Sequence, residues 1–377
     1  MKIAILGARG IPACYSGYDT LVEELSIGLV ESHSTEVLVY CRSSYYKRKP
    51  AVWQGIRLVY LPAPHGVKAL ESLVHSFLSS LHVLREKVDV IYFLDPANAP
   101  FCALLRLFGK RVVIHTDGLG WKRRKWGPLA RRYYKMVEWA CAKCGSALVT
   151  DNPAMQTYYR EEYGAATLFI SYGATNRHGV DTGIYADLGL IPNQYLLIVA
   201  RLEPENNTDL LISQYTKAGV DMPLVVVGDA PYGPQYMDYL RKESNANVLF
   251  AGRINDQAKL NALYRGAYLY IHGHEVGGTN PSLLRAMDAG TTPVVLNVPF
   301  NATVVEEAGV VFDRDNDSLA EVLAHLVAHP AEVREIAARA NLRAAQHFSW
   351  EAVASDHYAL FSRLASERKV SSSSVLE

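Results

Sequence analysis

Short apolar runs alternate with amphipathic segments through the first half of the chain. The runs predict strands at residues 2–6, 36–40, 56–61, 88–93, 111–114 and 147–149. Between most of them, apolar residues recur at spacings of three and four, which predicts helices such as 21–30, 69–84 and 129–144. Strands that are apolar on both faces and separated by helices form parallel sheets with helices on both sides. The first half therefore predicts a Rossmann-like domain.

The same alternation begins again after a weakly patterned stretch, residues 172–193. It predicts a second set of strands at 195–200, 224–227, 247–251, 267–271, 292–296 and 310–312. We therefore expect an α/β chain of two doubly wound domains, 1–178 and 190–349, with the boundary near 175–193. The serine-rich end of the chain predicts a disordered tail over 370–377.

Composition excludes several classes of protein. A chain of 377 residues suggests roughly two domains, and its 38 basic residues balance 38 acidic ones. No overall field therefore draws it to nucleic acid or membrane. The first residues lack the pattern of a signal peptide, and no apolar run approaches the ~20 residues of a membrane-spanning helix, so we expect a cytoplasmic or peripheral protein. Five scattered cysteines do not form a disulfide framework.

The stretch 271–290, IHGHEVGGTNPSLLRAMDAG, combines the end of a strand, a glycine turn and a helix start. Gly277 and Gly278 permit unusual backbone conformations, Asn280 is a good N-cap, and Pro281 suits the first helical position. A helix N-terminus reached through glycines offers unpaired N–H groups and the positive end of the helix dipole, which suit a phosphate. The alternative is an ordinary capped helix with no ligand.

Ligands of open parallel sheets lie beyond the carboxyl ends of the strands, where several polar residues occur. The first strand leads into a loop with three glycines, but its spacing departs from G-x-G-x-x-G and the second strand ends at Arg42, so a dinucleotide site is disfavoured. After the fifth strand, His115 and Asp117 place an imidazole and a carboxylate at an interdomain crevice. Alternatively, Asp117 caps a turn and His115 is its hydrogen-bonded neighbour.

Three further residues follow strands of the second domain. Arg201 leaves the first of them, where a guanidinium can grip a diphosphate; the alternative is an exposed ion pair with Glu203 or Glu205. Arg253 and Ile254 follow another strand and could offer backbone groups to the edge of a base.

One stretch departs from the overall balance of charge. From Trp121 to Lys135 the sequence WKRRKWGPLARRYYK holds seven basic residues and four aromatic ones, without an acid. Basic and aromatic residues together suit an anionic membrane surface or a lipid pyrophosphate. The alternative is a solvated helix flank with its tryptophans buried. Nucleic acid is disfavoured because no binding module accompanies the stretch.

Several longer sequence motifs are distributed over most of the chain. They include GARGIPACYSGYDTLVEEL, HTDGLGWKRRKWGPLARRY, VARLEPENN, FAGRI, IHGHEVGGTNPSLLRAMDAG and HFSWEAVASDHY. In this order they resemble the retaining family four glycosyltransferases, and within them the rhamnosyltransferase-like branch of bacterial capsule and cell-wall synthesis. The resemblance implies the GT-B fold, two Rossmann-like domains across a cleft, with a last helix at about 350–366 crossing back to the first domain. It implies a nucleotide sugar on the second domain and an acceptor on the first.

The resemblance also assigns site residues. It gives His115 and Asp117 to the reacting sugar and acceptor. The residues that would bind the diphosphate form a larger set: Arg201, Asn206, the loop residues Ser16 and Gly17, and the turn residues Gly278, Thr279 and Asn280. The nucleoside falls to Arg253, Ile254 and the position of Arg285.

Three departures from the family pattern concern charge. Two glutamates that the family carries eight residues apart are here Gly277 and Arg285, so Arg285 reverses the charge expected at the nucleotide ribose. Glu275 is a candidate for the missing first carboxylate. Asn206 replaces a lysine that many relatives use for phosphate.

We accordingly expect a cytoplasmic enzyme, peripheral on the inner face of the plasma membrane. It would transfer L-rhamnose from dTDP-rhamnose to a lipid-linked saccharide, with retention and without a metal or other cofactor. A UDP- or GDP-linked donor, a weakly active scaffold subunit, and an epimerase or phosphorylase on the same fold are the alternatives.

Overall fold

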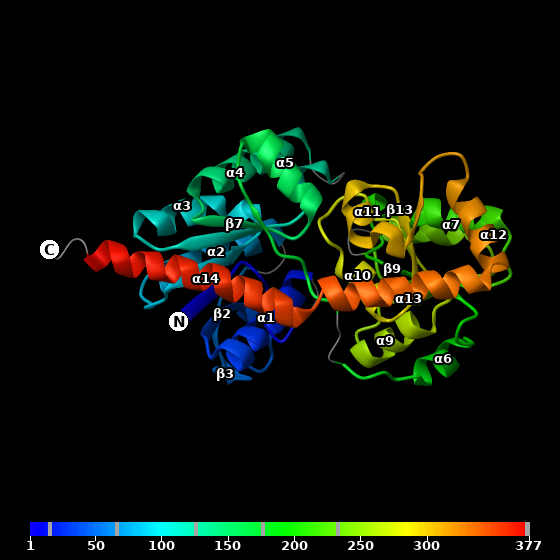
Figure 1. Ribbon diagram of the computed structural model, residues 1–377, viewed down its shortest axis with the longest axis horizontal. Coiled ribbons are helices and arrows are strands. Elements are labelled where there is room, and N and C mark those ends of the chain that lie inside the picture. The colour runs from blue at the N-terminus through cyan, green and yellow to red at the C-terminus, as the bar shows by residue number, and fades with distance from the viewer. Residues whose placement is uncertain (14–16, 65–67, 124–126, 175–177, 231–233, 374–377) are drawn as a thin grey trace. The chain divides into compact units, whose positions relative to one another are not determined.

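The computed structural model describes residues 1–13, 17–64, 68–123, 127–174, 178–230 and 234–373. Figure 1 shows two compact units, which are described separately. The first comprises Met1–Trp121, Trp126–Tyr172 and Trp350–Glu377, and the second Lys122–Lys125 and Gly173–Ser349. The main division thus falls between Tyr172 and Gly173, at the start of the weakly patterned stretch 172–193.

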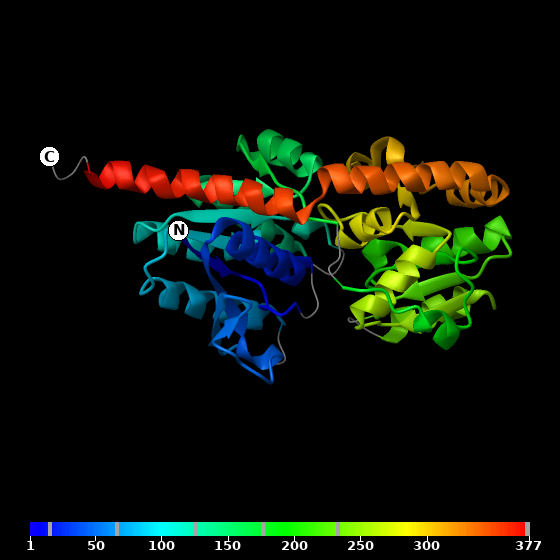
Figure 2. The same cartoon turned by 60° about the horizontal axis from the view of Figure 1, so that its bottom comes forward.

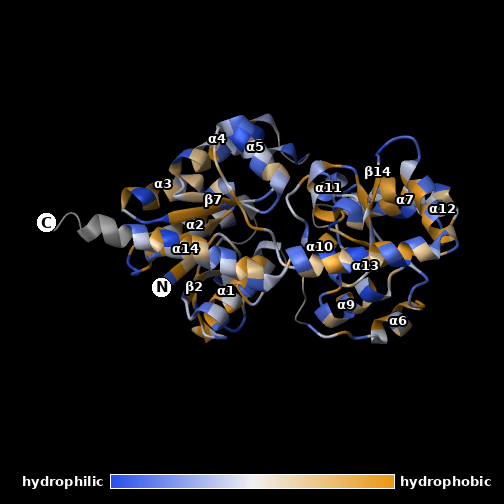
Figure 3. Cartoon of the chain, in the orientation of Figure 1, coloured by the Kyte–Doolittle hydropathy of each residue, from blue (hydrophilic) through white to orange (hydrophobic). Residues whose placement is uncertain are grey.

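The first unit is built on an eight-stranded sheet. In chain order its strands are β1 (Lys2–Leu6), β2 (Glu36–Arg42), β3 (Val52–Trp53), β4 (Ile56–Leu61), β5 (Val90–Leu94), β6 (Val112–Thr116), β7 (Ala147–Thr150) and β8 (Leu168–Phe169). Their order in the sheet is β3-β4-β2-β1-β5-β6-β7-β8, and every pairing is parallel except that of β3 with β4. Strands such as β7 are apolar along their length, as a sheet covered on both faces requires (Figure 3).

Two groups of helices cover this sheet. The unit contains α1 (Gly17–His33), α2 (Lys68–Val83), α3 (Ala99–Leu107), α4 (Pro128–Cys144), α5 (Pro153–Tyr163) and α14 (Trp350–Ser373). The C-terminal helix α14 lies beside α1, and Figures 1 and 2 both show them next to each other. Along the chain from α2 to α5, each helix packs against the next one. Right-handed crossovers place α1 and α2–α5 on opposite faces.

The C-terminal helix crosses back to the first unit, as the sequence predicted. It continues through Ser373, into the stretch 370–377 for which the sequence predicts a disordered tail. Extending a helix that already exists adds one hydrogen bond per residue without a new nucleus, and this favours continuation through weak helix formers. Residues 374–377 lie outside the described residues. No helix in the described ranges is long and apolar enough to span a membrane.

The second unit repeats the architecture with six parallel strands. They are β9 (Leu196–Val199), β10 (Leu224–Val227), β11 (Val248–Gly252), β12 (Leu269–His272), β13 (Thr292–Leu296) and β14 (Val310–Phe312), in the order β11-β10-β9-β12-β13-β14. Its helices are α6 (Gly183–Leu188), α7 (Thr208–Ala218), α8 (Pro234–Glu243), α9 (Gln257–Gly266), α10 (Pro281–Asp288), α11 (Pro299–Val305), α12 (Ser318–Ala328) and α13 (Pro330–His347).

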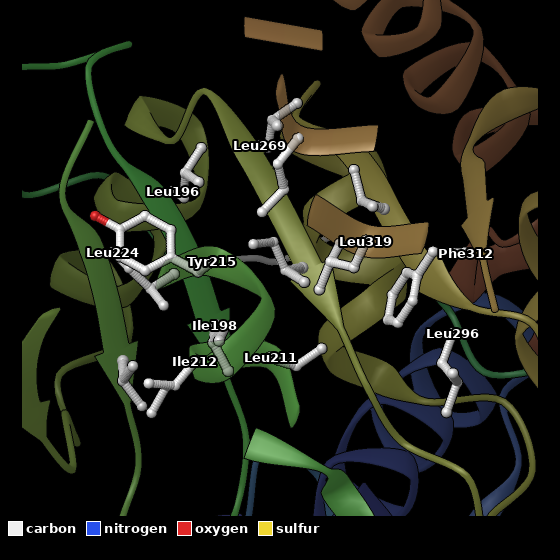
Figure 4. Packing of buried hydrophobic residues seen from close by; sticks show 14 of the residues in the cluster. Leu196, Ile198, Leu211, Ile212, Tyr215, Leu224, Leu269, Leu296, Phe312 and Leu319 are labelled. Atoms are coloured by element: carbon white, nitrogen blue, oxygen red, sulfur yellow. The ribbon is translucent and has the colours of Figure 1, made fainter. Parts of the chain in front are cut away.

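One apolar cluster joins this sheet to its helices. Leu196 and Leu269 from the strands pack with Tyr215 of α7 and Leu319 of α12, and all four are almost fully buried (Figure 4). The cluster fixes the strands, and with them the loops at their carboxyl ends.

All twelve strands predicted from the apolar pattern are present, with ends shifted by two residues at most. The two strands that the pattern missed, β3 and β8, have two residues each at the edges of the first sheet. Such a short strand contains no measurable alternation.

Candidate active site

The glycine turn leads into a capped helix, as predicted. Strand β12 ends at His272 and α10 begins at Pro281, where the Asn280 side-chain oxygen accepts a hydrogen bond from the Ser282 N–H at 3.1 Å. The Ser282 hydroxyl donates to the same oxygen at 2.8 Å and accepts from the Tyr270 hydroxyl at 2.8 Å. The cap is therefore tied to the strand that precedes the turn. It fixes the start of α10, where the positive end of the helix dipole favours an anion.

The loop after β9 runs beside this turn. The Asn206 side chain donates to the Arg201 carbonyl at 2.6 Å and is buried. Gly273 approaches the same loop so closely that a Cβ there would lie 2.7 Å from the Asn206 carbonyl oxygen. Asn206 was predicted to bind the diphosphate, but its amide already holds the loop. It therefore positions Arg201.

The Arg201 guanidinium is exposed at the end of this loop. Its Nη1 lies 3.5 Å from Glu203 Oε1, the ion pair that the sequence left as an alternative. The Glu203 side chain is buried, whereas 42% of the Arg201 side chain is exposed. A long ion pair made by a largely exposed guanidinium leaves donors available to a ligand.

Glu275 is held in a polar network instead of standing alone. Its carboxylate pairs with Arg314 and accepts from the Asn207 side chain at 3.3 Å, and Arg314 also donates to Asn207 Oδ1 at 2.9 Å. Asn207 donates in addition to the Gly273 carbonyl at 2.8 Å. The network joins the loops after β9, β12 and β14 and brings a second cation, which the sequence did not single out, to this edge of the sheet.

Two neutral histidines lie under the turn. The rings of His272 and His274 are stacked, with centroids 4.3 Å apart. Burial lowers the pKa of His272 to about 3 and that of His274 well below its ordinary value, with His272 and Arg201 contributing to the second shift. Both rings are therefore uncharged at neutral pH.

Arg285 extends from α10 to α9. Its Nη2 donates to Gln257 Oε1 at 2.9 Å and to Asn261 Oδ1 at 3.0 Å, and the guanidinium lies over the Tyr264 ring. Burial lowers its pKa, and its Nε has no hydrogen-bond partner in the described part of the chain. The acceptors in both hydrogen bonds are neutral amides. Arg253 is exposed and Ile254 half-buried in the loop that leads into α9, so the three predicted nucleoside residues lie around one helix.

In the first unit, His115 lies inside strand β6 and is 1% exposed. The His357 Nδ1 donates to the Val353 carbonyl at 2.8 Å, and His357 Nε2 lies 2.9 Å from the Tyr92 hydroxyl, which lies 2.6 Å from His115 Nδ1. If both rings are neutral, Tyr92 donates to His357 and His115 Nδ1 donates to Tyr92. Burial, followed by His357, lowers the pKa of His115 to about 3.

A polar cluster that the sequence did not single out surrounds Asp117. Burial, then Asp117 and Asp95, raise the pKa of Tyr18 well above its ordinary value, and Asp151 contributes further. Asp95, Asp117 and Asp151 follow immediately after the neighbouring strands β5, β6 and β7. The sequence could have predicted this cluster, because an acidic residue directly follows each of these three strands. In the described ranges, two buried polar atoms here, Tyr18 Oη and His115 Nε2, have no hydrogen-bond partner.

The glycine loop after β1 is attached to α1. The Arg9 N–H donates to the buried Asp19 carboxylate at 3.0 Å, and the guanidinium lies over the Tyr45 ring. Gly17, predicted to approach the diphosphate, is the first residue of α1. Ser16, predicted beside it, lies outside the described residues.

The stretch from Trp121 to Lys135 divides between two environments. The Trp121 indole donates to the Tyr158 hydroxyl at 3.1 Å, and the Lys135 ammonium lies 4.5 Å from the Trp121 ring and 2.7 Å from Glu162. These two residues therefore belong to an aromatic cluster with α5. Leu129 and Arg132 are exposed on α4.

One group of side chains in the described residues has the spacing of metal ligands. His325, His329 and Glu332 have their ligand atoms within 4.8 Å of one another at the corner between α12 and α13, and all three are exposed. His325 Nε2 already lies 2.8 Å from Glu332 Oε2. The group is distant in the fold from the glycine turn.

Family models match both halves of the chain. Residues 191–344 match the model described as glycosyl transferases group 1, and residues 1–175 match one described as a domain of unknown function, DUF1972. Residues 191–344, in the second unit, are therefore similar to group 1 glycosyl transferases. Comparison with curated proteins gives no match.

Solved structures show the fold of the whole chain. Sucrose-phosphate synthase from Thermosynechococcus elongatus is 19% identical, with a TM-score of 0.83 over 97% of this chain and 99% of that one. HepE from Anabaena in complex with UDP is 17% identical, with a TM-score of 0.72 over 96% of this chain and 100% of the other. A glycosyltransferase from Rickettsia africae is 12% identical, with a TM-score of 0.69 over 96% and 98% of the two chains. The predicted GT-B fold is confirmed.

Proposed function

We propose that this chain is a retaining glycosyltransferase that transfers L-rhamnose from dTDP-rhamnose to a hydroxyl of a lipid-linked saccharide in bacterial polysaccharide synthesis. The observation that carries the proposal is the capped helix α10, which follows a glycine turn within a group 1 glycosyltransferase domain. The N–H groups of the turn before it, the positive end of its dipole and the exposed Arg201 suit a diphosphate. The donor sugar and the acceptor rest on the resemblance of the sequence.

The donor diphosphate gains negative charge as it departs. N–H groups of Gly278, Thr279 and Asn280 and the Arg201 guanidinium would stabilise that charge, and Asn206 would keep Arg201 in position through its carbonyl. In this proposal Gly17 approaches the donor phosphate from the first unit, together with Ser16. The departing phosphate oxygen takes the proton of the acceptor hydroxyl on the same face of the sugar. The amides and guanidinium supply the charge compensation that a metal would otherwise give.

The acceptor hydroxyl would meet the polar cluster around Asp117. A half-buried carboxylate can accept a hydrogen bond from a hydroxyl group without the cost of full burial, which suits Asp117 for orienting the acceptor. His115 is too deeply buried to touch a sugar in this structure, so we assign it a positioning role through Tyr92. The unpartnered Tyr18 hydroxyl supports a ligand at this edge, because buried polar atoms are normally satisfied.

The direct test is a transfer assay. Purified protein is incubated with dTDP-rhamnose and a glucosyl or N-acetylglucosaminyl lipid acceptor, and the product is weighed by mass spectrometry. We expect a rhamnosyl adduct with retained anomeric configuration in the nuclear magnetic resonance spectrum. Turnover of another nucleotide sugar, with no rhamnosyl product, would remove the donor assignment and leave glycosyl transfer standing.

Two observations favour alternatives. The HepE structures contain UDP and UDP-glucose, so a UDP-linked donor is the first alternative, with a GDP-linked one behind it. A thermal-shift series over nucleotide sugars separates them, because a ligand that binds the folded state raises the melting temperature with its concentration. Arg285, a half-buried cation where the resemblance implies a carboxylate, favours a weakly active scaffold. A large rise in turnover for Arg285→Glu would support the scaffold, and a loss would assign Arg285, with Arg253 and Ile254, to the nucleoside.

A further inference from the structure

The first unit exposes a group of large apolar side chains on three consecutive helices. They are Leu70, Leu73, Phe77 and Leu81 on α2, Leu107 and Phe108 at the end of α3, and Leu129, Tyr133, Met136 and Trp139 on α4. We call this set the apolar helical face. The exposed large apolar residues of the second unit, such as Ile191 and Leu342, occur singly.

The face is continuous because the three helices are neighbours. Helix α3 packs against both α2 and α4. The rings of Phe77 on α2 and Phe101 on α3 have centroids 6.1 Å apart, and the Tyr133 hydroxyl of α4 donates to the Ala97 carbonyl just before α3 at 3.3 Å. Continuous apolar surface of this kind marks an interaction site, whereas single exposed apolar residues do not.

Exposure is greatest at two points of the face. Leu107 is 84% exposed and Leu129 is 82% exposed. On α4, Leu129, Arg132, Met136, Trp139 and Lys143 follow at spacings of three and four, so apolar and basic side chains share one side of the helix. Long basic side chains can lie along apolar surface and place their charge at its rim.

The acids of the same helices are withdrawn from the surface. By sequence, α2, α3 and α4 contain two acidic residues, Glu71 and Glu138. Glu71 is buried 3.5 Å from Arg42, and the buried Glu138 accepts hydrogen bonds from the Tyr158 and Tyr163 hydroxyls at 2.8 Å. The charges that these three helices expose are therefore basic.

A basic cavity adjoins the ends of α3 and α4. It measures about 470 Å³ and is lined by Arg106, Gly109, Lys110, Arg111, Gly145, Ser146, Leu364 and Glu367. Three cations outnumber one acid in this lining, and Arg106 and Gly109 flank the exposed Leu107 and Phe108. An anionic group beside an apolar phase would fit both features.

We propose that the apolar helical face docks the protein on a membrane surface rich in anionic phospholipid. Apolar side chains of Leu129, Met136 and Trp139 enter the boundary between headgroups and acyl chains, while Arg132 and Lys143 meet lipid phosphates. A second copy of the chain fits less well, because a symmetric interface would set these basic side chains against one another. The surface overlaps the linear stretch 121–135 at Leu129, Arg132 and Tyr133, but excludes its Trp121 and Lys135, which are engaged with α5.

The test is flotation of the full chain with vesicles of phosphatidylcholine alone or mixed equally with phosphatidylglycerol. We expect binding to the mixed vesicles that weakens with added salt. The triple variant Leu129→Ser/Met136→Ser/Trp139→Ser should bind at least about tenfold more weakly, because the inserted apolar surface is lost. The variant Arg106→Gln/Arg132→Gln/Lys143→Gln should lose the preference for phosphatidylglycerol.

The matched control is Ile191→Ser/Leu342→Ser, which removes exposed apolar residues of the second unit and should float like wild type. Trp139 gives an independent readout: brominated phosphatidylglycerol should quench wild-type fluorescence more than that of Trp139→Phe. Flotation of the triple variant like wild type would overturn the proposal, and so would equal binding to both vesicles. A lipid-independent dimer that the triple variant abolishes would overturn it in favour of self-association. The readout involves no sugar transfer, so it is independent of the proposed enzymatic function.

Discussion

The carboxyl ends of the strands carry opposite chemistry in the two units. In the second unit they present the start of α10 together with Arg201 and Arg314. In the first unit, Asp95, Asp117 and Asp151 follow three neighbouring strands. Both units use the same parallel sheet, so the difference lies in the loops. One edge suits an anion and the other suits hydroxyl groups, and this division is the physical basis for assigning donor and acceptor to different units.

The two edges share one feature, a neutral histidine buried at the end of a strand. His115 in β6 and His272 in β12 are each 1% exposed, and burial lowers the pKa of each to about 3. Each also lies within hydrogen-bonding distance of a tyrosine hydroxyl. A neutral ring adds no charge to either edge, so the contrast between them comes from the loop residues alone.

The largest expected effect comes from Arg201→Gln. Removing one preorganised donor from a developing anion typically lowers kcat by about 10²–10³-fold, and we expect a loss in that range with the proposed donor. The measurement is steady-state transfer, with donor affinity from calorimetry. Arg241→Gln, an exposed arginine of α8, is the matched control and should change neither. Full activity in Arg201→Gln would move the diphosphate elsewhere and remove the contrast between the two edges.

Acid should destabilise both units through their buried histidines. Above pH 6.5 the rings of His115, His272 and His357 are neutral whether folded or unfolded. Below it the unfolded chain takes up protons, whereas the folded rings do not until about pH 3 to 4. Stability is therefore lost as the pH falls, by about 2 kcal/mol for each histidine at about pH 5.

Hydrogen exchange at pH 7 and pH 5 measures this loss in each unit separately, which matters because the two units need not unfold together. His115→Gln and His272→Gln should each flatten the pH dependence of their own unit. The exposed His347→Gln is the control and should leave it unchanged. Equal pH dependence of stability in all three variants would contradict the assignment of the acid sensitivity to His115 and His272.

The N-caps of two helices, one in each unit, allow a direct comparison of the two sheet edges. Asn280 caps α10, and Asn152 caps α5 in the first unit by accepting from the Ala154 N–H at 2.9 Å. Replacing either with alanine should lower the free energy of unfolding by about 1 kcal/mol. We expect Asn280→Ala alone to weaken donor binding in calorimetry, because only this cap fixes the turn whose N–H groups are proposed to meet the diphosphate. Equal donor affinity in the two variants would count against an anion site at α10.

The sequence predicted the sheets better than the sites. Continuous apolar runs identify strands such as β10 and β13 directly, because a buried strand needs apolar residues on both faces. The cap of α10 was also predictable, since Asn280 and Pro281 act on the backbone next to them. These features depend on interactions that are local in sequence.

Roles that depend on distant contacts were not predictable. Nothing near Asn206 shows that its amide is used by the Arg201 carbonyl, or that Glu275 meets Arg314, which lies 39 residues further along the chain. The same holds for His115, because Tyr92 links it to His357 of α14, which is far away in the sequence. Such partners are set by how elements pack.

The smallest expected effect concerns the ion pair between Arg314 and Glu275. Their side chains are 43% and 21% exposed, and pairs in contact with solvent contribute up to about 1 kcal/mol, so Arg314→Gln should barely change the melting temperature. If Glu275 acts at the donor sugar, the same variant should change transfer much more than stability, because the carboxylate loses the cation that orients it. Glu275→Gln should then reproduce the change in transfer.

The exposed pair Lys217 and Asp317, on the same unit, is the control: Lys217→Gln should leave transfer unaffected. Unchanged transfer in both Arg314→Gln and Glu275→Gln would reduce the network to a structural link between loops. Arg201 and the N–H groups of the glycine turn would then define the anion-binding edge.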